Sequence, residues 1–119
     1  MIELNENFSL ADLGNVKKEA FDVLYNKTRV STCEGTMYIT PDKMYYLVAP
    51  VQPSNNALDR IGGAPKSWCL DLSEIASYGK YGLGGFKIDL KDGNVVRFAN
   101  VFRKKRNAIV EALEERMNK

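Results

Sequence analysis

Positive side chains gather in one stretch of this sequence, between residues 94 and 110. The stretch contains five basic residues and no acidic one: Arg97, Arg103, Lys104, Lys105 and Arg106. If a helix begins near residue 100, four of these charges lie in its first turns, where unpaired backbone N–H groups also favour anions. Two interpretations stay open. The basic side chains are solvent-exposed at the start of the helix and their stems cover apolar surface, or they form a patch that binds an anion or an acidic partner.

Other groups that could carry chemistry are missing or badly placed. The chain has no histidine, which removes the commonest general base and metal ligand. Its two cysteines, Cys33 and Cys69, are far apart in the sequence, and a carboxylate such as Asp71 raises the pKa of a nearby thiol. The glycine-rich segment 82–85 precedes an expected strand, so no helix start is available for a phosphate. We therefore expect no enzyme, no metal site and no cofactor.

The composition is that of one soluble globular domain. The chain has 119 residues, of which 45% are hydrophobic and 27% charged. A net charge of +2 is too small to indicate nucleic acid or an acidic membrane by itself. No signal peptide and no apolar run long enough for a membrane span is visible. We expect a cytoplasmic protein with reduced cysteines, and peripheral attachment to the membrane is the alternative location.

The positive stretch follows a predicted β-hairpin over residues 85–99. Apolar residues alternate with charged ones over Phe86–Leu90, which predicts a strand with one dry face. A two-residue turn would place Val96 and Phe98 on the solvent-exposed face of the hairpin. A three-residue loop at residues 91–93 instead pairs Ile88 with Val96 and Phe86 with Phe98, with Gly93 in the left-handed position. A one-residue slip reverses every side chain, so we predict the three-residue loop.

A capping helix is predicted for residues 100–118. Asn100 is the candidate N-cap. The charges oppose the helix dipole, because basic residues crowd its start and glutamates lie in its second half. Arg106 lies on the apolar side, where its stem packs at the rim and its guanidinium reaches water. The apolar stripe at helical spacing consists of Phe102, Ile109, Val110, Leu113 and Met117.

Residues 1–19 form a predicted N-terminal helical extension. Ser9 and Asp12 have the spacing of a capping box at the start of a short helix. Residues 20–33 are rich in β-branched and aromatic side chains and are predicted to form one strand, straight or bulged. In an alternative interpretation, the helix extends through Phe21 and Leu24.

The middle of the chain contains a second hairpin. A two-residue turn at Pro41 and Asp42 predicts cross-strand pairs between Ile39 and Met44, Met37 and Tyr46, and Tyr38 and Tyr45. Residues 51–66 are a loop, because they show no periodicity and hold several prolines and glycines. Residues 67–72 form a strand with Trp68, Leu70 and Leu72 inward, and a turn at 73–74 leads to a strand over 75–81.

These elements predict a mainly β domain spanning residues 1–119, with the sheet in residues 20–99. The sheet is a seven-stranded, bent antiparallel one or a partly open barrel, closed by one C-terminal α-helix. The order of elements resembles the pleckstrin-homology (PH) superfold, and the residue pattern is closer to its GRAM and bacterial PH-like branch. The resemblance covers about residues 20–118. It rests on residues 35–40 with 43–46, on Leu72–Ile75 after a strand, and on Gly85–Ile88 with Asp92–Gly93 and Arg97–Phe98 before the helix.

The resemblance implies a non-catalytic binding module. In this superfold, the sheet edges and the groove beside the helix receive extended peptides, the loops at the open end receive lipid head groups, and bacterial members self-associate. Lys27 and Arg29 are similar to the basic signature of lipid-binding PH domains, but our strand over 20–33 places them inside a strand. Tyrosines near these charges could also stack nucleic-acid bases.

We therefore predict protein–protein interaction or self-assembly as the function. Lipid head-group binding is the first alternative and nucleic-acid binding, which we disfavour, the second. The candidate partner-binding residues are Lys27, Arg29, Arg103, Lys104, Lys105 and Arg106.

Overall fold

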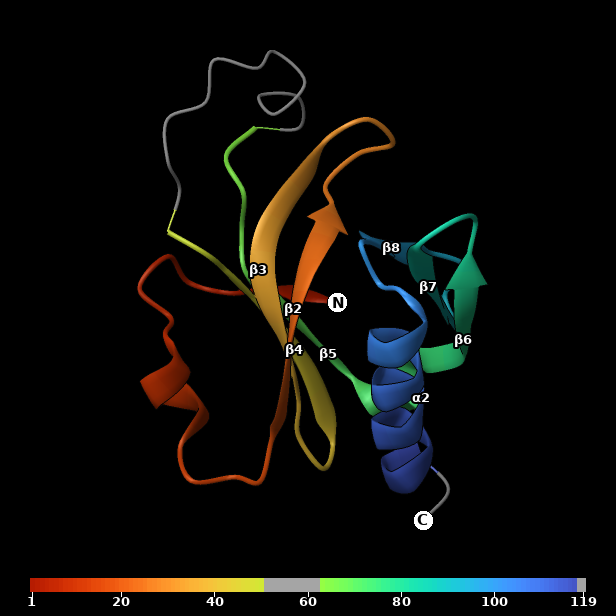
Figure 1. The fold of residues 1–119 in the computed structure, drawn as a ribbon. Helices are drawn as coiled ribbons and strands as arrows, with labels where there is room; N and C mark the ends of the chain where they lie inside the picture. The colour runs from red at the N-terminus through yellow and green to blue at the C-terminus, as the bar shows by residue number, and fades with distance from the viewer. Residues whose placement is uncertain (51–62, 118–119) are drawn as a thin grey trace.

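The computed structural model describes residues 1–50 and 63–117, which form an antiparallel sheet, two short 3-10 helices and one α-helix. Figure 1 shows strands β2–β5 on one side, strands β6–β8 on the other, and α2 running between the two groups. The described elements are β1 (Ile2–Glu3), η1 (Leu10–Leu13), β2 (Glu19–Asn26), β3 (Thr32–Ile39), β4 (Lys43–Val48), β5 (Trp68–Asp71), η2 (Leu72–Glu74), β6 (Ile75–Tyr81), β7 (Gly85–Leu90), β8 (Val95–Ala99) and α2 (Arg103–Met117).

The strands form one continuous sheet with the order β1-β5-β4-β3-β2-β8-β7-β6. All neighbouring strands are antiparallel. The two groups of strands meet at β2 and β8, where only Leu24 with Ala99 and Tyr25 with Phe98 are paired. The mainly β fold with one C-terminal helix is thus confirmed, with eight strands in the described residues where the sequence predicted seven.

The hairpin of β7 and β8 has the predicted register. Phe86 pairs with Phe98 and Ile88 with Val96, and all four side chains are buried. The Leu90 N–H donates to the Asn94 carbonyl (2.8 Å), which leaves three residues in the loop. Gly93 has a φ of 94°, as the left-handed position of such a loop requires.

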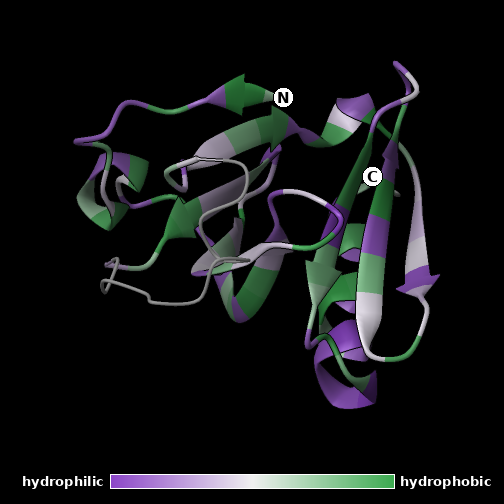
Figure 2. Cartoon of the chain, turned by 90° about the horizontal axis from the view of Figure 1, so that it is seen from above, coloured by the Kyte–Doolittle hydropathy of each residue, from purple (hydrophilic) through white to green (hydrophobic). Residues whose placement is uncertain are grey.

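The hairpin of β3 and β4 also confirms its predicted pairs. Ile39 lies opposite Met44, and the Thr40 N–H donates to the Lys43 carbonyl (2.9 Å) around the two-residue turn. Met37 pairs with Tyr46 and Tyr38 with Tyr45. Alternation along these strands places one set of side chains in the core and the other toward solvent, and Figure 2 shows the resulting bands of hydropathy.

The prediction of one strand over residues 20–33 was wrong, because these residues form β2, a turn and the start of β3. The Thr28 hydroxyl accepts hydrogen bonds from the backbone N–H groups of Val30 (3.3 Å) and Ser31 (3.2 Å). Such side-chain bonds stabilise a turn without glycine or proline, the residues by which turns are usually recognised. Lys27 and Arg29 consequently lie in this turn and not within a strand.

The N-terminal segment joins the sheet instead of forming only a helical extension. Ile2 pairs with Cys69 and Glu3 with Trp68, so β1 extends the sheet beyond β5. The expected helix is limited to the single 3-10 turn η1, whose capping box includes the bond from the Ser9 N–H to the Asp12 carboxylate (2.6 Å). Trp68, Leu70 and Leu72 point inward as predicted, but Cys69 is buried as well because β1 lies beside it.

The start of α2 differs from the prediction. The Arg106 N–H donates to the Phe102 carbonyl (2.8 Å), so Phe102, and not Asn100, stands at the N-cap. Asn100 has a φ of 56° and belongs to the connection that turns the chain away from β8. Phe102 is 63% exposed and leaves the expected apolar stripe, whereas Val101 fills the core in its place.

The rest of the predicted stripe packs against the sheet. Ile109 and Leu113 are fully buried, and Val110 and Met117 are half-buried against the same core. The centre of that core is an aromatic cluster in which each ring centroid lies within 5.1–6.3 Å of another; its members are Tyr25, Tyr46, Trp68 and Phe98. α2 therefore closes the bent sheet, as predicted.

Candidate functional site

The thiols and a buried tyrosine hydroxyl are the reactive side chains to consider first within the described residues. Within the described residues, no three potential ligands of the His, Cys, Asp or Glu type gather around a point where a metal could sit. Cys33 and Cys69 are both free thiols, and burial raises the pKa of each. The Tyr46 hydroxyl donates to the Cys33 carbonyl (2.7 Å), and burial raises its pKa. These groups are held protonated in the core, which suits packing and not nucleophilic attack.

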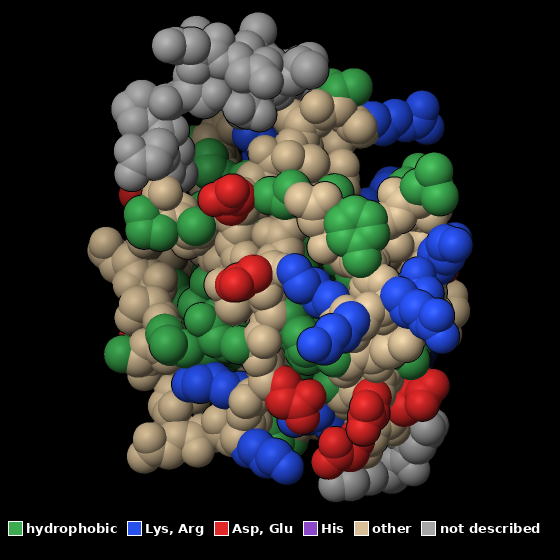
Figure 3. All heavy atoms as spheres, in the orientation of Figure 1, with side chains coloured by type: hydrophobic (Ala, Val, Ile, Leu, Met, Phe, Trp, Pro, Cys, Tyr) green, Lys and Arg blue, Asp and Glu red, His purple; other side chains and the backbone are tan. Residues whose placement is uncertain are grey.

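The six predicted binding residues lie on two different elements. Lys27 and Arg29 belong to the turn between β2 and β3, where the Lys27 ammonium donates to the Gly63 carbonyl (3.4 Å). The other four occupy the first turn of α2 and are Arg103, Lys104, Lys105 and Arg106. Figure 3 shows Lys and Arg side chains gathered around the start of α2 and acidic side chains around its second half.

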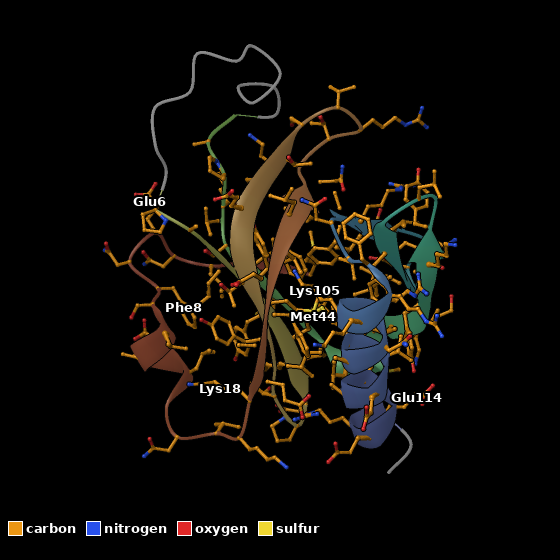
Figure 4. All side chains as sticks on the ribbon, viewed as in Figure 1. Glu6, Phe8, Lys18, Met44, Lys105 and Glu114 are labelled. Carbon is orange, nitrogen blue, oxygen red and sulfur yellow. The ribbon has the colours of Figure 1, made fainter. Side chains whose placement is uncertain are left out.

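The four charges on α2 do not point the same way. The Lys105 ammonium donates to the Asp22 carbonyl of β2, which fixes the helix to the sheet where β2 is no longer paired with β8 (Figure 4). Arg106 is half-buried, while Arg103 and Lys104 are exposed. The sequence therefore predicted the charge cluster, but Lys105 stabilises the fold and only Arg103 and Lys104 are fully presented to solvent.

Among the described strands, β6 lies at one end of the sheet and its outer edge is unpaired. Along its seven residues β6 pairs only with β7, and within the described parts of the chain no strand lies on its other side. Its exposed residues are Ala76, Ser77, Lys80 and Tyr81. The pairing register shifts between Ile75 and Ser77, so a β-bulge interrupts the start of the strand.

The helix α2 lies beside this edge. Burial raises the pKa of Tyr78 on β6, and the nearby Glu114 carboxylate on α2 raises it further. Glu114 belongs to the acidic second half of the helix, while Phe102, just before the helix, contacts the loop after β6. α2 thus runs antiparallel to β6, with its basic start at the Tyr81 end of the strand.

Two exposed apolar side chains were not predicted as part of any site. Leu83 lies in the loop between β6 and β7 and is fully exposed, and Phe102 lies against the same loop. The sequence signal was the isolated leucine among three glycines in residues 82–85, which we had interpreted only as a flexible joint. Arg97 stacks over Tyr81 at the end of β6, with 5.4 Å from its guanidinium carbon to the ring centroid.

Two open hollows lie on the described surface. One, of about 410 Å³, lies between β2 and α2, is lined by Ala20, Ala108 and Ala112, and has glutamates at its rim. Another, of about 630 Å³, lies beside the N-terminal segment and includes Phe8 and Val48. In the larger hollow, the Ser67 hydroxyl accepts a hydrogen bond from the Val48 N–H (3.0 Å) and Lys66 forms an ion pair with Glu3 (2.9 Å).

This combination of bent sheet, closing helix and open edge matches solved structures of low sequence similarity. The N-terminal PH domain of human ARAP2 superimposes with a TM-score of 0.61 and 11% identity, over 96% of this chain and 86% of that one. The fold is that of a PH domain. Neither the family models nor the curated proteins compared with the sequence give a match.

Two further solved structures match at similarly low sequence identity. The C-terminal domain of an unknown protein from Leishmania infantum gives a TM-score of 0.65 at 13% identity, over 92% of this chain and 91% of that one. The DH/PH domain of human ARHGEF11, solved in a ternary complex with human RhoA and its inhibitor, gives 0.63 at 17% identity. In the latter case the alignment covers 90% of this chain and 30% of that one. At such identities the likeness establishes the PH fold. Among the described residues no helix is both long and apolar enough to cross a membrane.

Proposed function

We propose that this PH-like domain is a non-catalytic protein-interaction module that binds an extended segment along the free edge of β6. The observation that supports the proposal is the contrast between the two ends of the sheet, because β1 covers β5 while no described residue pairs with the outer edge of β6. A free strand edge offers unpaired N–H and C=O groups to an added strand. The segment comes from a partner or, for self-assembly, from a second copy of this chain.

The neighbouring helix supplies selectivity for such a segment. A strand added beside β6 runs next to α2, whose start is basic and whose second half is acidic. Acidic residues of the ligand then lie near Arg103 and Arg106, with Lys104 beside them. The reversed charge order of α2 opposes the helix dipole and weakens the helix by about 0.3 kcal/mol per charge. Binding of an acidic segment near the start of α2 would explain why the chain has this charge order.

Lipid head-group binding is the second candidate function. It is supported by the position of Lys27 and Arg29, which lie in the turn between β2 and β3 and not on a strand face. A turn allows both side chains to converge on one phosphate, which a strand does not, because successive strand residues point to opposite faces.

A peptide selection with structural mapping tests the leading proposal. A ligand selected from a displayed library of random 12-residue peptides is titrated into ¹⁵N-labelled protein. We expect the largest amide shifts in β6 and on the adjacent side of α2. The blocking variant is Gly79→Pro, because a side chain at Gly79 meets no atom within 4 Å and proline interrupts the strand along which an added segment would pair. It should weaken binding at least about tenfold.

The matched control is Ile2→Pro in β1, at the opposite edge of the sheet. Thermal unfolding of each variant confirms that it is folded. Shifts confined to β1 and β5, or binding that is lost in Ile2→Pro and kept in Gly79→Pro, would contradict the proposal. Sedimentation velocity on the same variants tests self-assembly, since Gly79→Pro should convert an oligomer built on β6 into a monomer.

A further inference from the structure

A groove between β2 and α2 combines an apolar lining with a negative rim. It is the hollow of about 410 Å³ described above, which lies within the range of about 300–1,000 Å³ that ligand pockets usually have. Its apolar lining consists of Ala20 and Phe21 from β2 and Ala108 and Ala112 from α2. No described residue that lines it belongs to β6 or to the basic first turn of α2. The groove is therefore a different surface from the β6 edge.

Three glutamates form the rim of the groove. Glu19 stands on the strand side, and Glu111 and Glu115 stand about one helical turn apart on the α2 side. Figure 3 shows acidic side chains gathered at this half of α2. Among the described residues, no lysine or arginine lines the groove, although the whole chain has a net charge of +2. The rim therefore attracts a cation and repels nucleic acid and anionic lipid.

A buried arginine fixes one of these glutamates. The Arg116 side chain is only 6% exposed, and its nitrogens Nη1 and Nη2 each lie 3.3 Å from the same carboxylate oxygen of Glu19. The second oxygen of Glu19 bonds to no described group, so it remains available to a ligand. Arg116 is thus a positioning residue that holds Glu19 at the edge of the groove.

The two glutamates on α2 lack such a partner. Neither Glu111 nor Glu115 forms an ion pair with any described residue. Lys105, which also reaches β2 from the helix, bonds to the Asp22 carbonyl instead. Like charges four residues apart on a helix repel each other and slightly weaken it. A cation supplied from outside the domain would remove this repulsion.

We propose that this groove receives a lysine side chain presented by a protein partner. The aliphatic stem of the lysine lies along the alanines of the lining, as lysine stems commonly do on apolar surface, and the ammonium group lies among the three carboxylates. Lysine fits better than arginine, because an ammonium has three N–H donors that carboxylates on two different walls can share. A guanidinium makes its best contacts with a single carboxylate in its own plane. The proposal is independent of peptide binding at β6.

Binding of a short model peptide tests the proposal. The peptide consists of a central lysine between alanines, with both ends blocked, and is titrated into ¹⁵N-labelled protein at low salt. We expect the largest amide shifts at Ala20, Phe21, Ala108 and Ala112. Norleucine in place of lysine keeps an aliphatic stem without the charge and should weaken binding at least about tenfold. Trimethyl-lysine keeps the charge but has no N–H donor, so it should weaken binding by a similar factor.

Variants of the protein provide the second half of the test. Glu111→Gln combined with Glu115→Gln removes two carboxylates at nearly constant side-chain size and should weaken binding of the lysine peptide at least about tenfold. Ala108→Phe should have the same effect, because the added ring occupies the groove. The matched control is Glu6→Gln combined with Glu34→Gln, which changes the net charge equally at two exposed glutamates outside the groove. It should bind the peptide like the unchanged protein, and thermal unfolding confirms that each variant is folded.

Several results would overturn the proposal. One is the absence of shifts at the groove amides, even at high peptide concentration. Another is equal binding of the norleucine or trimethyl-lysine peptide, which would show that the ammonium group is not recognised. Equal weakening in the control pair would reduce the effect to overall charge. Loss of binding in Gly79→Pro, with full binding in Glu111→Gln/Glu115→Gln, would place the lysine at the β6 edge. A dimer of the protein alone that Glu111→Gln/Glu115→Gln abolishes would identify a second copy as the occupant.

Discussion

The two ends of this sheet differ in whether further residues pair with the strand that lies there. At the β5 edge, the N-terminal segment adds β1, the Leu4 N–H donates to the Ser67 carbonyl (2.8 Å), and Phe8 stacks on Tyr45 with ring centroids 5.8 Å apart. At the β6 edge, no described residue pairs with the outer side of the strand. An uncovered edge invites pairing with another chain, so proteins usually cover it or keep it short.

The difference indicates which edge is available for binding. The chain uses its first residues to pair with Trp68 and Cys69 on the outer side of β5, although β5 has only four residues. Within the described residues it leaves open the edge of β6, which has seven, and places α2 next to it. Covering the shorter edge and exposing the longer one is consistent with a binding role for β6.

The largest expected effect comes from breaking the hairpin that forms the open edge. A Cβ at Gly85 would lie less than 3.0 Å from the Tyr81 carbonyl oxygen, which is backbone and cannot move aside cheaply. Gly85→Ala should therefore lower the free energy of unfolding by about 3 kcal/mol, as overpacking does. Urea unfolding followed by far-UV circular dichroism measures it.

Gly79→Ala is the control on the same strand, because nothing lies within 4 Å of its added Cβ. This variant should be as stable as the unchanged protein or more stable by up to about 1 kcal/mol, because alanine restricts the unfolded chain. Equal destabilisation by both substitutions would show that the β6–β7 hairpin is not as tight as described.

The next effect concerns the covered edge. Phe8→Ala removes the ring that stacks on Tyr45 and should lower the free energy of unfolding by about 2 kcal/mol. This is less than for a fully buried phenylalanine, because Phe8 is half-buried.

Loosening the N-terminal segment by the same substitution also uncovers Cys69, which is only 7% exposed beside β1. Its labelling by a thiol reagent should accelerate at least about tenfold, since labelling requires an accessible thiolate. Cys33, which lies away from β1, should react at its original rate, and equal acceleration of both thiols would indicate general unfolding instead.

A smaller effect is expected in the aromatic core between the edges. Tyr46→Phe removes the hydrogen bond to the Cys33 carbonyl and should cost about 1 kcal/mol at pH 7. Burial raises the pKa of Tyr46 and of Tyr25 above the ordinary value of 10.0. At pH values above about 10, the unfolded chain loses these protons while the folded one keeps them, so stability falls as pH rises.

Because Tyr46→Phe removes one of the groups responsible, its stability should fall less steeply than that of the unchanged protein above pH 10. Urea unfolding at pH 7, 9 and 10.5 compares the two proteins. Parallel pH curves would exclude Tyr46 as a contributor to the alkaline loss.

The smallest effect concerns the ion pair of Lys43 and Asp71, which joins β4 to β5 on the covered side. Hydrogen bonding to the Asp71 carboxylate is the main cause of the raised pKa of Lys43. Both side chains are more than a third exposed to solvent, so Asp71→Asn should cost less than about 1 kcal/mol. Unfolding in 0.05 M and 1 M NaCl measures the difference, which should shrink at high salt. A loss that exceeds this value and persists at high salt would show that the pair acts as a buried one.

Much of the fold could be predicted because its hairpins are local. The loop ending in Gly93 and the turn at Pro41 and Asp42 select one register each, and the period-two pattern allows only the register that buries the apolar face. The candidate site was harder to predict from the sequence. The charge cluster at the start of α2 is visible in the sequence, but the sequence does not reveal that Lys105 bonds to the β2 carbonyl while Arg103 remains exposed.

The errors also have physical causes. The turn between β2 and β3 lacks glycine and proline and depends on hydrogen bonds made by Thr28, a weaker sequence signal. Phe102 has the spacing of the apolar stripe, but the helix begins one residue after it, so the ring lies on Gly84 and not in the core. Spacing alone cannot fix where a helix begins when the preceding connection is irregular.

The sequence by itself determined the alternation of its strands, the registers of the two hairpins and the apolar side of the helix, because each depends on residues close along the chain. Only the tertiary structure decided that Ile2 pairs with Cys69, that no described strand pairs with the outer edge of β6 and that the Phe102 ring lies against Gly84. Each of these depends on contacts between segments distant in sequence, and their geometry follows from how the whole sheet bends and closes around one core.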